Sequence, residues 1–144
     1  MLTKKDIRYL YKAKRIADIS DFEKQNIGCV AVYKGDIISV GYNSNRTHPM
    51  QKYYNKYREI KYKQDEMLPK LHAEINCLNS IKMLDIDFSR VKLYIYRKRR
   101  DQEYGLARPC PSCMRAIMDL GILDIYYTTN YGFCHEKVNN KGVA

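Results

Sequence analysis

Hydrophobic positions in the first third of the chain change from a helical to a strand pattern. Between residues 3 and 19 they recur every three or four positions, which predicts an amphipathic helix that Thr3 can cap. Two apolar, β-branched runs follow at residues 27–33 and 36–42. Because the intervening Lys34-Gly35 pair is typical of a tight turn, these runs predict a β-hairpin.

The later part of the chain alternates helix and strand patterns. Apolar positions at helical spacing predict helices near residues 71–81 and 109–120, and Gly121 suits the C-terminal end of the second. Short apolar runs predict three further strands, at residues 91–96, 125–129 and 133–138. This order predicts a single α/β domain over residues 1–144, with its core at about 27–138 and its helices packed on a sheet of about five strands.

The charge of the chain narrows the choice of partners. Among 144 residues, 26 are Lys or Arg and 16 are Asp or Glu, which gives a formal net charge of +10. An excess of this size favours phosphorylated or polyanionic partners. Tyrosines alternate with basic residues over 51–63, and Arg97–Arg100 form a second basic segment. The tyrosine-rich stretch could stack bases of a nucleic acid, or it could be a solvated helix whose rings pack partly on the core.

Several protein classes are excluded by composition. No stretch approaches the roughly 20 apolar residues that cross a bilayer. Residues 1–7 lack the apolar segment of a signal peptide, and five irregularly spaced cysteines do not suit a secreted disulfide scaffold. We therefore expect a cytoplasmic protein without a membrane partner.

Two short motifs carry candidate chemistry. His72 and Glu74 open one predicted helix, and Cys110 and Cys113 open another. Imidazole nitrogen and thiolate sulfur are ligands that Zn²⁺ prefers, and three protein ligands leave a fourth position for water, as in catalytic sites. His72, Cys110 and Cys113 thus form a candidate zinc site, and Glu74 is a candidate general acid and base.

These motifs resemble those of the cytidine deaminase superfamily, the zinc-dependent deaminases of the CMP and dCMP type. The similarity is carried by His72-Ala73-Glu74 and by Pro109-Cys110 with Cys113, and it is closest to phage-type cytidine and deoxycytidylate deaminase-like proteins. Those proteins also share Gly41-Tyr42-Asn43, Thr47-His48-Pro49 and Gly105–Cys110 with this chain. The resemblance implies a three-layer α/β/α sandwich around a mixed sheet.

The resemblance also implies an activity and its residues. A zinc-activated water would attack C4 of a cytosine ring in a nucleoside or nucleotide, ammonia would leave, and Glu74 would carry the proton. The Ala73 backbone N–H would hold the pyrimidine carbonyl, and Asn43 would contact the sugar. Further substrate or nucleic-acid contacts are expected from the neighbourhood of the site, at His48, Arg99, Arg100, Arg108 and Tyr131.

The C-terminal segment departs from one branch of this family. Only 16 residues follow Thr128, too few for a helix and a parallel fifth strand. The turn expected at residues 130–132 predicts an antiparallel fifth strand, as in small nucleoside deaminases and some toxin-type deaminases. The C-terminal segment therefore does not favour a deoxycytidylate deaminase over these other deaminases.

Three alternatives stay open at this point. The chain could deaminate cytosine in single-stranded DNA or RNA, for which the charge and residues 51–63 are the support. Its substrate could contain a purine instead of cytosine, because the two motifs indicate hydrolytic deamination but do not indicate which base is deaminated. It could be a non-catalytic zinc-containing nucleic-acid-binding module, although such a module has no use for Glu74. Self-association is also open, because small deaminases of this fold often share active sites across subunits.

Overall fold

A five-stranded mixed sheet forms the centre of the protein. The computed structural model describes residues 2–21, 25–58 and 70–138. The strand order is β2-β1-β3-β4-β5; β3 and β4 run parallel, and the other three neighbouring pairs are antiparallel. The strands are β1 (Asn26–Tyr33), β2 (Asp36–Tyr42), β3 (Val91–Lys98), β4 (Asp124–Thr129) and β5 (Gly132–Lys137). The predicted antiparallel fifth strand is confirmed.

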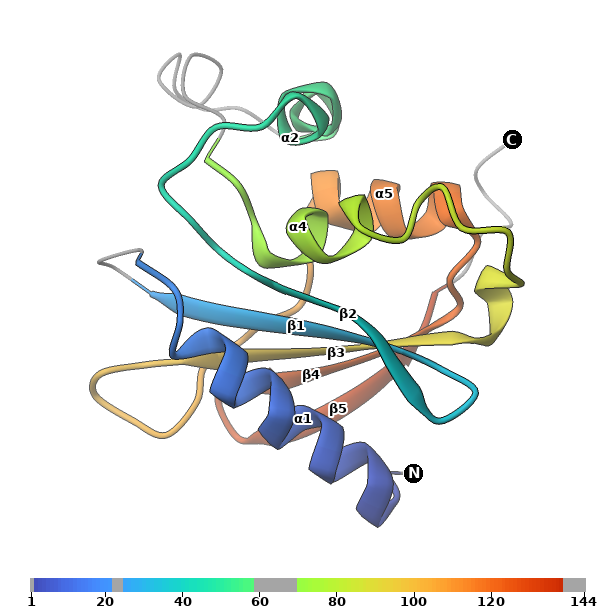
Figure 1. The fold of residues 1–144 in the computed structure, drawn as a ribbon. Coiled ribbons are helices and arrows are strands. Elements are labelled where there is room, and N and C mark those ends of the chain that lie inside the picture. The colour runs from blue at the N-terminus through green and yellow to red at the C-terminus, as the bar shows by residue number, and fades with distance from the viewer. Residues whose placement is uncertain (1, 22–24, 59–69, 139–144) are drawn as a thin grey trace.

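Helices cover both faces of the sheet, so the predicted three-layer sandwich is confirmed (Figure 1). One face carries α1 (Lys4–Ala17), which crosses β1 and β3. The opposite face carries α4 (Ala73–Asn79) and α5 (Pro111–Leu120), and α2 (Pro49–Tyr54) packs against these two helices on their outer side. Two short 3₁₀ turns complete the described elements, η1 (Asn55–Tyr57) and η2 (Phe88–Arg90).

Helix α1 is held by its capping box and by a buried polar contact. Thr3 Oγ1 accepts a hydrogen bond from Asp6 N, and Asp6 accepts one from Thr3 N. The Tyr94 hydroxyl of β3 donates to Asp6 Oδ1 at 2.6 Å. Burial alone would raise the pKa of Asp6, but these hydrogen bonds outweigh it and lower the pKa. The carboxylate therefore ties the start of α1 to the central strand.

Replacing Asp6 by asparagine is expected to lower the free energy of unfolding by about 1 kcal/mol at pH 7. A carboxyl group whose folded-state pKa is lowered stabilises the fold above its unfolded pKa of about 3.9, and that contribution disappears as pH falls through the folded value. The difference between wild type and Asp6→Asn should therefore shrink below about pH 4. Urea denaturation at pH 7, 5 and 3 measures it; a constant difference would contradict this role of the carboxylate.

The opposite face holds the larger part of the core and the candidate site. Apolar side chains of α4 and α5 pack on β1, β3 and β4. His72 is the N-cap residue of α4 and Cys110 that of α5. Pro111 at the first helical position and Gly121, with φ +90° at the C-cap, explain where α5 begins and ends. Both candidate ligand motifs thus lie where a helix starts on the same face of the sheet.

The observed boundaries differ from the predicted ones at the ends of α4 and β3. Helix α4 ends at Asn79, and residues 80–84 form turns. Strand β3 continues to Lys98 because β1 pairs with it as far as Asn26, so half of the basic segment 97–100 belongs to the sheet. The described part of the tyrosine-rich stretch is helical, in α2 and η1, while residues 59–69 lie outside the described residues. Among the described helices, none is long and apolar enough to cross a membrane.

Candidate active site

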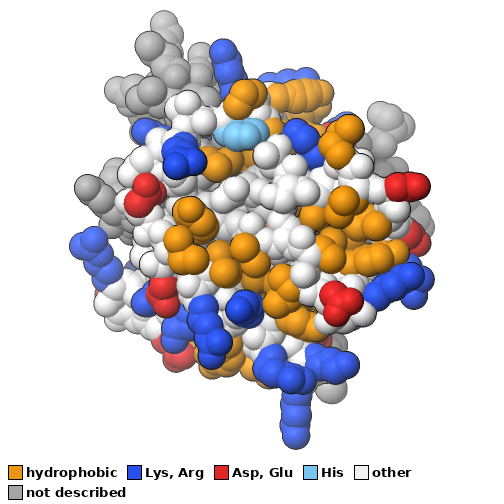
Figure 2. All heavy atoms as spheres, in the orientation of Figure 1, with side chains coloured by type: hydrophobic (Ala, Val, Ile, Leu, Met, Phe, Trp, Pro, Cys, Tyr) orange, Lys and Arg blue, Asp and Glu red, His pale blue; other side chains and the backbone are white. Residues whose placement is uncertain are grey.

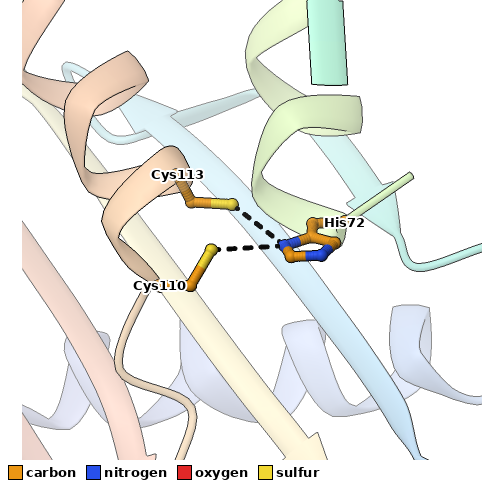
Figure 3. Close-up of side chains that lie close together, drawn as sticks. All are labelled: His72, Cys110 and Cys113. Carbon is orange, nitrogen blue, oxygen red and sulfur yellow. Dashed lines mark hydrogen bonds between the residues drawn. The ribbon is translucent and has the colours of Figure 1, made fainter. Parts of the chain in front are cut away.

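Three side chains from two helix starts converge on one point (Figure 3). His72 Nδ1 lies 3.5 Å from Cys110 Sγ and 3.3 Å from Cys113 Sγ. Cys110 and Cys113 lie one helical turn apart at the start of α5, so both sulfurs point toward the imidazole at the start of α4. The predicted His/Cys/Cys cluster is therefore brought together by the fold.

The geometry and charge of this cluster suit zinc. A tetrahedral ion with ordinary Zn–N and Zn–S distances separates nitrogen from sulfur by about 3.6 Å, close to the two observed separations. Hydrogen bonding with Cys113 and with His72 lowers the pKa of Cys110 to about 3, against the effect of burial, and this favours the thiolate form that binds zinc. Burial raises the pKa of the Cys113 thiol, and coordination would supply the positive charge that it needs to ionise.

Glu74 lies in the first turn of α4, beside the cluster. Its side chain is buried, with 5% of the residue exposed, and burial raises its pKa to about 6. The charge of His72 opposes that rise. A carboxyl group with such a pKa can both accept and release a proton near neutral pH, as a general acid and base requires.

His72, Cys110 and Glu74 line one cavity of about 280 Å³, and Cys113 is buried behind them. One wall of the cavity is formed by the start of α4 and the residues before it. The other walls are formed by the start of β1, the ends of β2 and β3, and the loop that leads into α5. Thr128 holds that loop, since its Oγ1 donates to Gly105 O and its carbonyl accepts from Ala107 N. The lining residues are Gln25, Ile27, Asn43, Arg58, Lys70, Leu71, His72, Glu74, Arg97, Leu106, Ala107, Arg108 and Cys110.

Two predicted substrate contacts line this cavity. Asn43 lies at its wall, but its Oδ1 already accepts from Ile27 N and Ser20 Oγ, and its Nδ2 donates to Gln25 O. Arg108 also lines it, and forms two parallel hydrogen bonds to Glu136 of β5 at 2.9 Å. Each therefore has a structural partner as well as access to the site. Ala73, the third predicted contact, is the first residue of α4 and is buried, and it is not among the described residues that line the cavity.

The other predicted contacts lie outside the lining of the cavity. His48 caps α2, with Nδ1 accepting from Met50 N. Arg99 pairs with Asp101 in the loop after β3, where Arg100 is exposed. Tyr131 lies in the turn between β4 and β5 and is 96% exposed. None of these four is among the described residues that line the cavity.

The structure adds residues that the motifs did not indicate. Arg58 and Lys70 line the cavity from either side of residues 59–69. Gln51, inside the tyrosine-rich stretch, is fully buried and accepts a hydrogen bond from His72 N. The one sequence signal was the basic character of this stretch, which does not distinguish a residue facing the site from one facing solvent.

Comparison with known proteins agrees with this geometry. A family model described as the cytidine and deoxycytidylate deaminase zinc-binding region matches residues 3–129. No curated protein was found to match the chain in sequence.

Three solved structures show the same fold at low identity. The dCMP deaminase of cyanophage S-TIM5 has 20% identity and a TM-score of 0.62, covering 90% of this chain and 86% of its own. The cytidine deaminase of Burkholderia pseudomallei has 14% identity and a TM-score of 0.61, covering 95% and 94%. The guanine deaminase of Bacillus subtilis has 20% identity and a TM-score of 0.51, covering 89% and 65%. The fold is therefore shared by enzymes that differ in the ring named in their descriptions.

Proposed function

The chain belongs to the cytidine and deoxycytidylate deaminase family, whose matched region binds zinc, and on this premise we propose that it hydrolyses the amino group from a cytosine nucleoside or nucleotide. His72, Cys110 and Cys113 hold the zinc, and Glu74 carries protons. The observation that supports this most is the buried carboxyl group of Glu74, which lines one cavity together with the candidate ligands His72 and Cys110. A structural zinc site has no need of such a group.

The proposed reaction assigns one task to each of these residues. His72, Cys110 and Cys113 would hold the zinc ion, which when bound would lower the pKa of a coordinated water to about 7 and so supply a nucleophile at neutral pH. Among the described residues that line the cavity, Glu74 has the sole carboxyl group. It is positioned to take the proton of that water and to pass it to the leaving nitrogen. The second proton of the water ends on N3 of the ring, C4 keeps the oxygen as a carbonyl, and the amino group leaves as ammonia.

Basic side chains around the cavity favour a substrate with a phosphate group. Arg58, Lys70, Arg97 and Arg108 all line it. Lys70 donates to Asn45 O, Arg97 to Leu106 O, and Arg108 to Glu136, whereas Arg58 makes no side-chain hydrogen bond or ion pair to any described residue. Arg58 is therefore the guanidinium most available to a phosphate. The cyanophage relative was crystallised with dCMP and dUMP, which suits this choice.

The surface gives less support to a polynucleotide substrate. Tyr53 is 48% exposed, but the Lys56 ammonium lies 4.0 Å from its ring centroid. Tyr57 has Lys56 and the Arg115 guanidinium within about 5 Å of its ring. The protein's own cations thus occupy stacking positions that bases would need. On the face shown in Figure 2, Lys and Arg side chains are scattered among hydrophobic and uncharged groups. We therefore propose that the substrate is a free nucleotide and not a polynucleotide.

A substrate panel tests the proposed function. Zinc-loaded protein would be incubated with cytidine, deoxycytidine, their monophosphates and a short cytosine-containing single strand, and uracil formation measured for each. Turnover of monophosphates supports the proposal. Uracil from the strand alone would replace it by an editing activity, and no uracil from any substrate would overturn the cytosine assignment, with guanine and adenine derivatives as the next panel.

Replacing Arg58 by glutamine is expected to reduce kcat/KM for the monophosphate by about 10-fold and to leave that for the nucleoside unchanged. The reason is the loss of one charge-assisted hydrogen bond to phosphate. Arg90→Gln is the matched control, since it removes the same charge on η2, outside the residues that line the cavity. Equal losses on both substrates, or an equal loss in the control, would contradict a phosphate contact at Arg58.

A further inference from the structure

A pair of buried amides lies behind the zinc-ligating histidine. Gln51 of α2 is 0% exposed, and Asn55 of η1 is also buried. Gln51 Oε1 accepts a hydrogen bond from the backbone N–H of His72 at 3.0 Å. Gln51 Nε2 donates to Asn55 Oδ1 at 2.8 Å. The two side chains therefore form a short chain of hydrogen bonds that ends on the backbone of a metal ligand.

This contact matters because it is the side-chain hydrogen bond that holds the backbone of His72, next to Leu71, whose own backbone is bonded to Ser44 and Arg46. Its ring presents Nδ1 to the two sulfurs. Among the described residues, Nε2 has no hydrogen-bond partner, although a metal-ligating histidine usually has its second nitrogen held by one. His72 caps α4 without a side-chain cap bond. The direction of the ring thus depends on where the backbone of residue 72 is held, and the contact from outside α4 that holds its N–H is Gln51.

The same segment is also fastened to the helix that carries the cysteines. The Tyr54 hydroxyl donates to Asp119 Oδ2 of α5 at 2.9 Å. Asp119 also pairs with Arg115 at 3.0 Å, and the Arg115 guanidinium lies 5.0 Å from the centroid of Tyr57. Residues 49–57 therefore contact both the element that supplies His72 and the element that supplies Cys110 and Cys113.

We propose that Gln51 and Asn55 are positioning residues of the zinc site, which set the backbone of His72 at the distance from the α5 thiolates that a tetrahedral ion requires. This inference rests on the zinc site of the proposed function, though not on its substrate. It assigns a structural task to part of the tyrosine- and lysine-rich stretch. Gln51 does not touch substrate; it acts through His72.

Matched variants of the amide pair test the proposal through metal binding. Gln51→Met keeps length and burial but leaves His72 N without an acceptor, and Asn55→Leu leaves Gln51 Nε2 without one. Each is expected to weaken zinc affinity by about tenfold, as loss of a residue that orients a ligand typically does. Asn55→Asp keeps the acceptor and should restore near-wild-type affinity. Zinc affinity would be measured by competition with a chromophoric chelator.

The visible absorption spectrum of the cobalt-substituted protein reports the geometry of the metal site, which a general loss of stability would not change. In Gln51→Met and Asn55→Leu, the visible bands of the Co²⁺ protein should shift or weaken, because His72 is displaced from the thiolates. Tyr94→Phe, which breaks the contact to Asp6 on the other face, should leave both affinity and spectrum unchanged. If Gln51→Met fails to fold, the Asn55 pair carries the test alone.

Three results would overturn the proposal. The first is wild-type zinc affinity and a wild-type cobalt spectrum in both Gln51→Met and Asn55→Leu. The second is an equal loss of zinc affinity in Asn55→Asp and Asn55→Leu. The third is an equal loss of zinc affinity in Tyr94→Phe. Because no substrate is used, absence of deaminase activity in wild type would reject the proposed function without bearing on these measurements.

Discussion

Replacing Glu74 by glutamine is expected to reduce the turnover of a cytosine nucleotide by about 10³-fold. Positioned proton transfer contributes about 10² to 10⁴ in rate, and glutamine keeps the size of the side chain but cannot carry a proton. Glu74 is buried beside the ligand cluster, and among the described residues lining the cavity no second carboxyl group could take over. The loss should appear in kcat, because the amide still fills the same space.

Two measurements separate this result from damage to the site. Zinc content and the cobalt spectrum of Glu74→Gln should match those of wild type, since Glu74 is not one of the three ligands. Glu136→Gln removes a carboxylate from β5 that pairs with Arg108, outside the residues that line the cavity, and should retain most of the turnover. Full activity in Glu74→Gln would reject the assigned proton carrier, and loss of zinc would show that the residue serves the metal instead.

The site was predictable from the chain where it depends on local sequence. His72-Ala73-Glu74 and Cys110 with Cys113 each lie within one helical turn, so spacing alone brings their side chains to one helix start. The fifth strand was equally local, because a turn at residues 130–132 folds it back on β4. These features follow from a few consecutive residues and need no knowledge of the remainder of the chain.

What the sequence did not show depends on contacts between distant segments. Gln51 reaches His72 from 21 positions away, and nothing in a stretch dominated by tyrosine and lysine marks one glutamine as buried. Lys70 comes to the cavity mouth where it pairs with Thr47 in an isolated β-bridge. The end of β3 at Lys98 is set by its pairing with Asn26. Each of these required the packing of α2 and the sheet to be known.

Close packing of α4 on β2 leads to the second large prediction. A Cβ atom at Gly41 would lie 2.5 Å from the carbonyl oxygen of Ala73 and 2.5 Å from the backbone nitrogen of Cys77. Backbone atoms cannot turn aside as a flexible side chain can, so Gly41→Ala must push α4 away from the sheet. Such overpacking is expected to lower the free energy of unfolding by about 3 kcal/mol. Urea denaturation in the presence of a chelator measures this change in the free energy of unfolding without the contribution of zinc binding.

The same displacement should weaken the metal site, since α4 carries His72 while the cysteines stay on α5. Gly28→Ala is the matched control, because its Cβ would meet the backbone of α1 at Ala13 and Ala17 on the other face of the sheet. It should destabilise the protein at least as much, yet leave the zinc affinity of the folded protein near wild type. Equal loss of zinc in both variants would mean that the site responds to overall stability rather than to the position of α4. Undiminished affinity in Gly41→Ala would mean that the loop before His72 absorbs the shift.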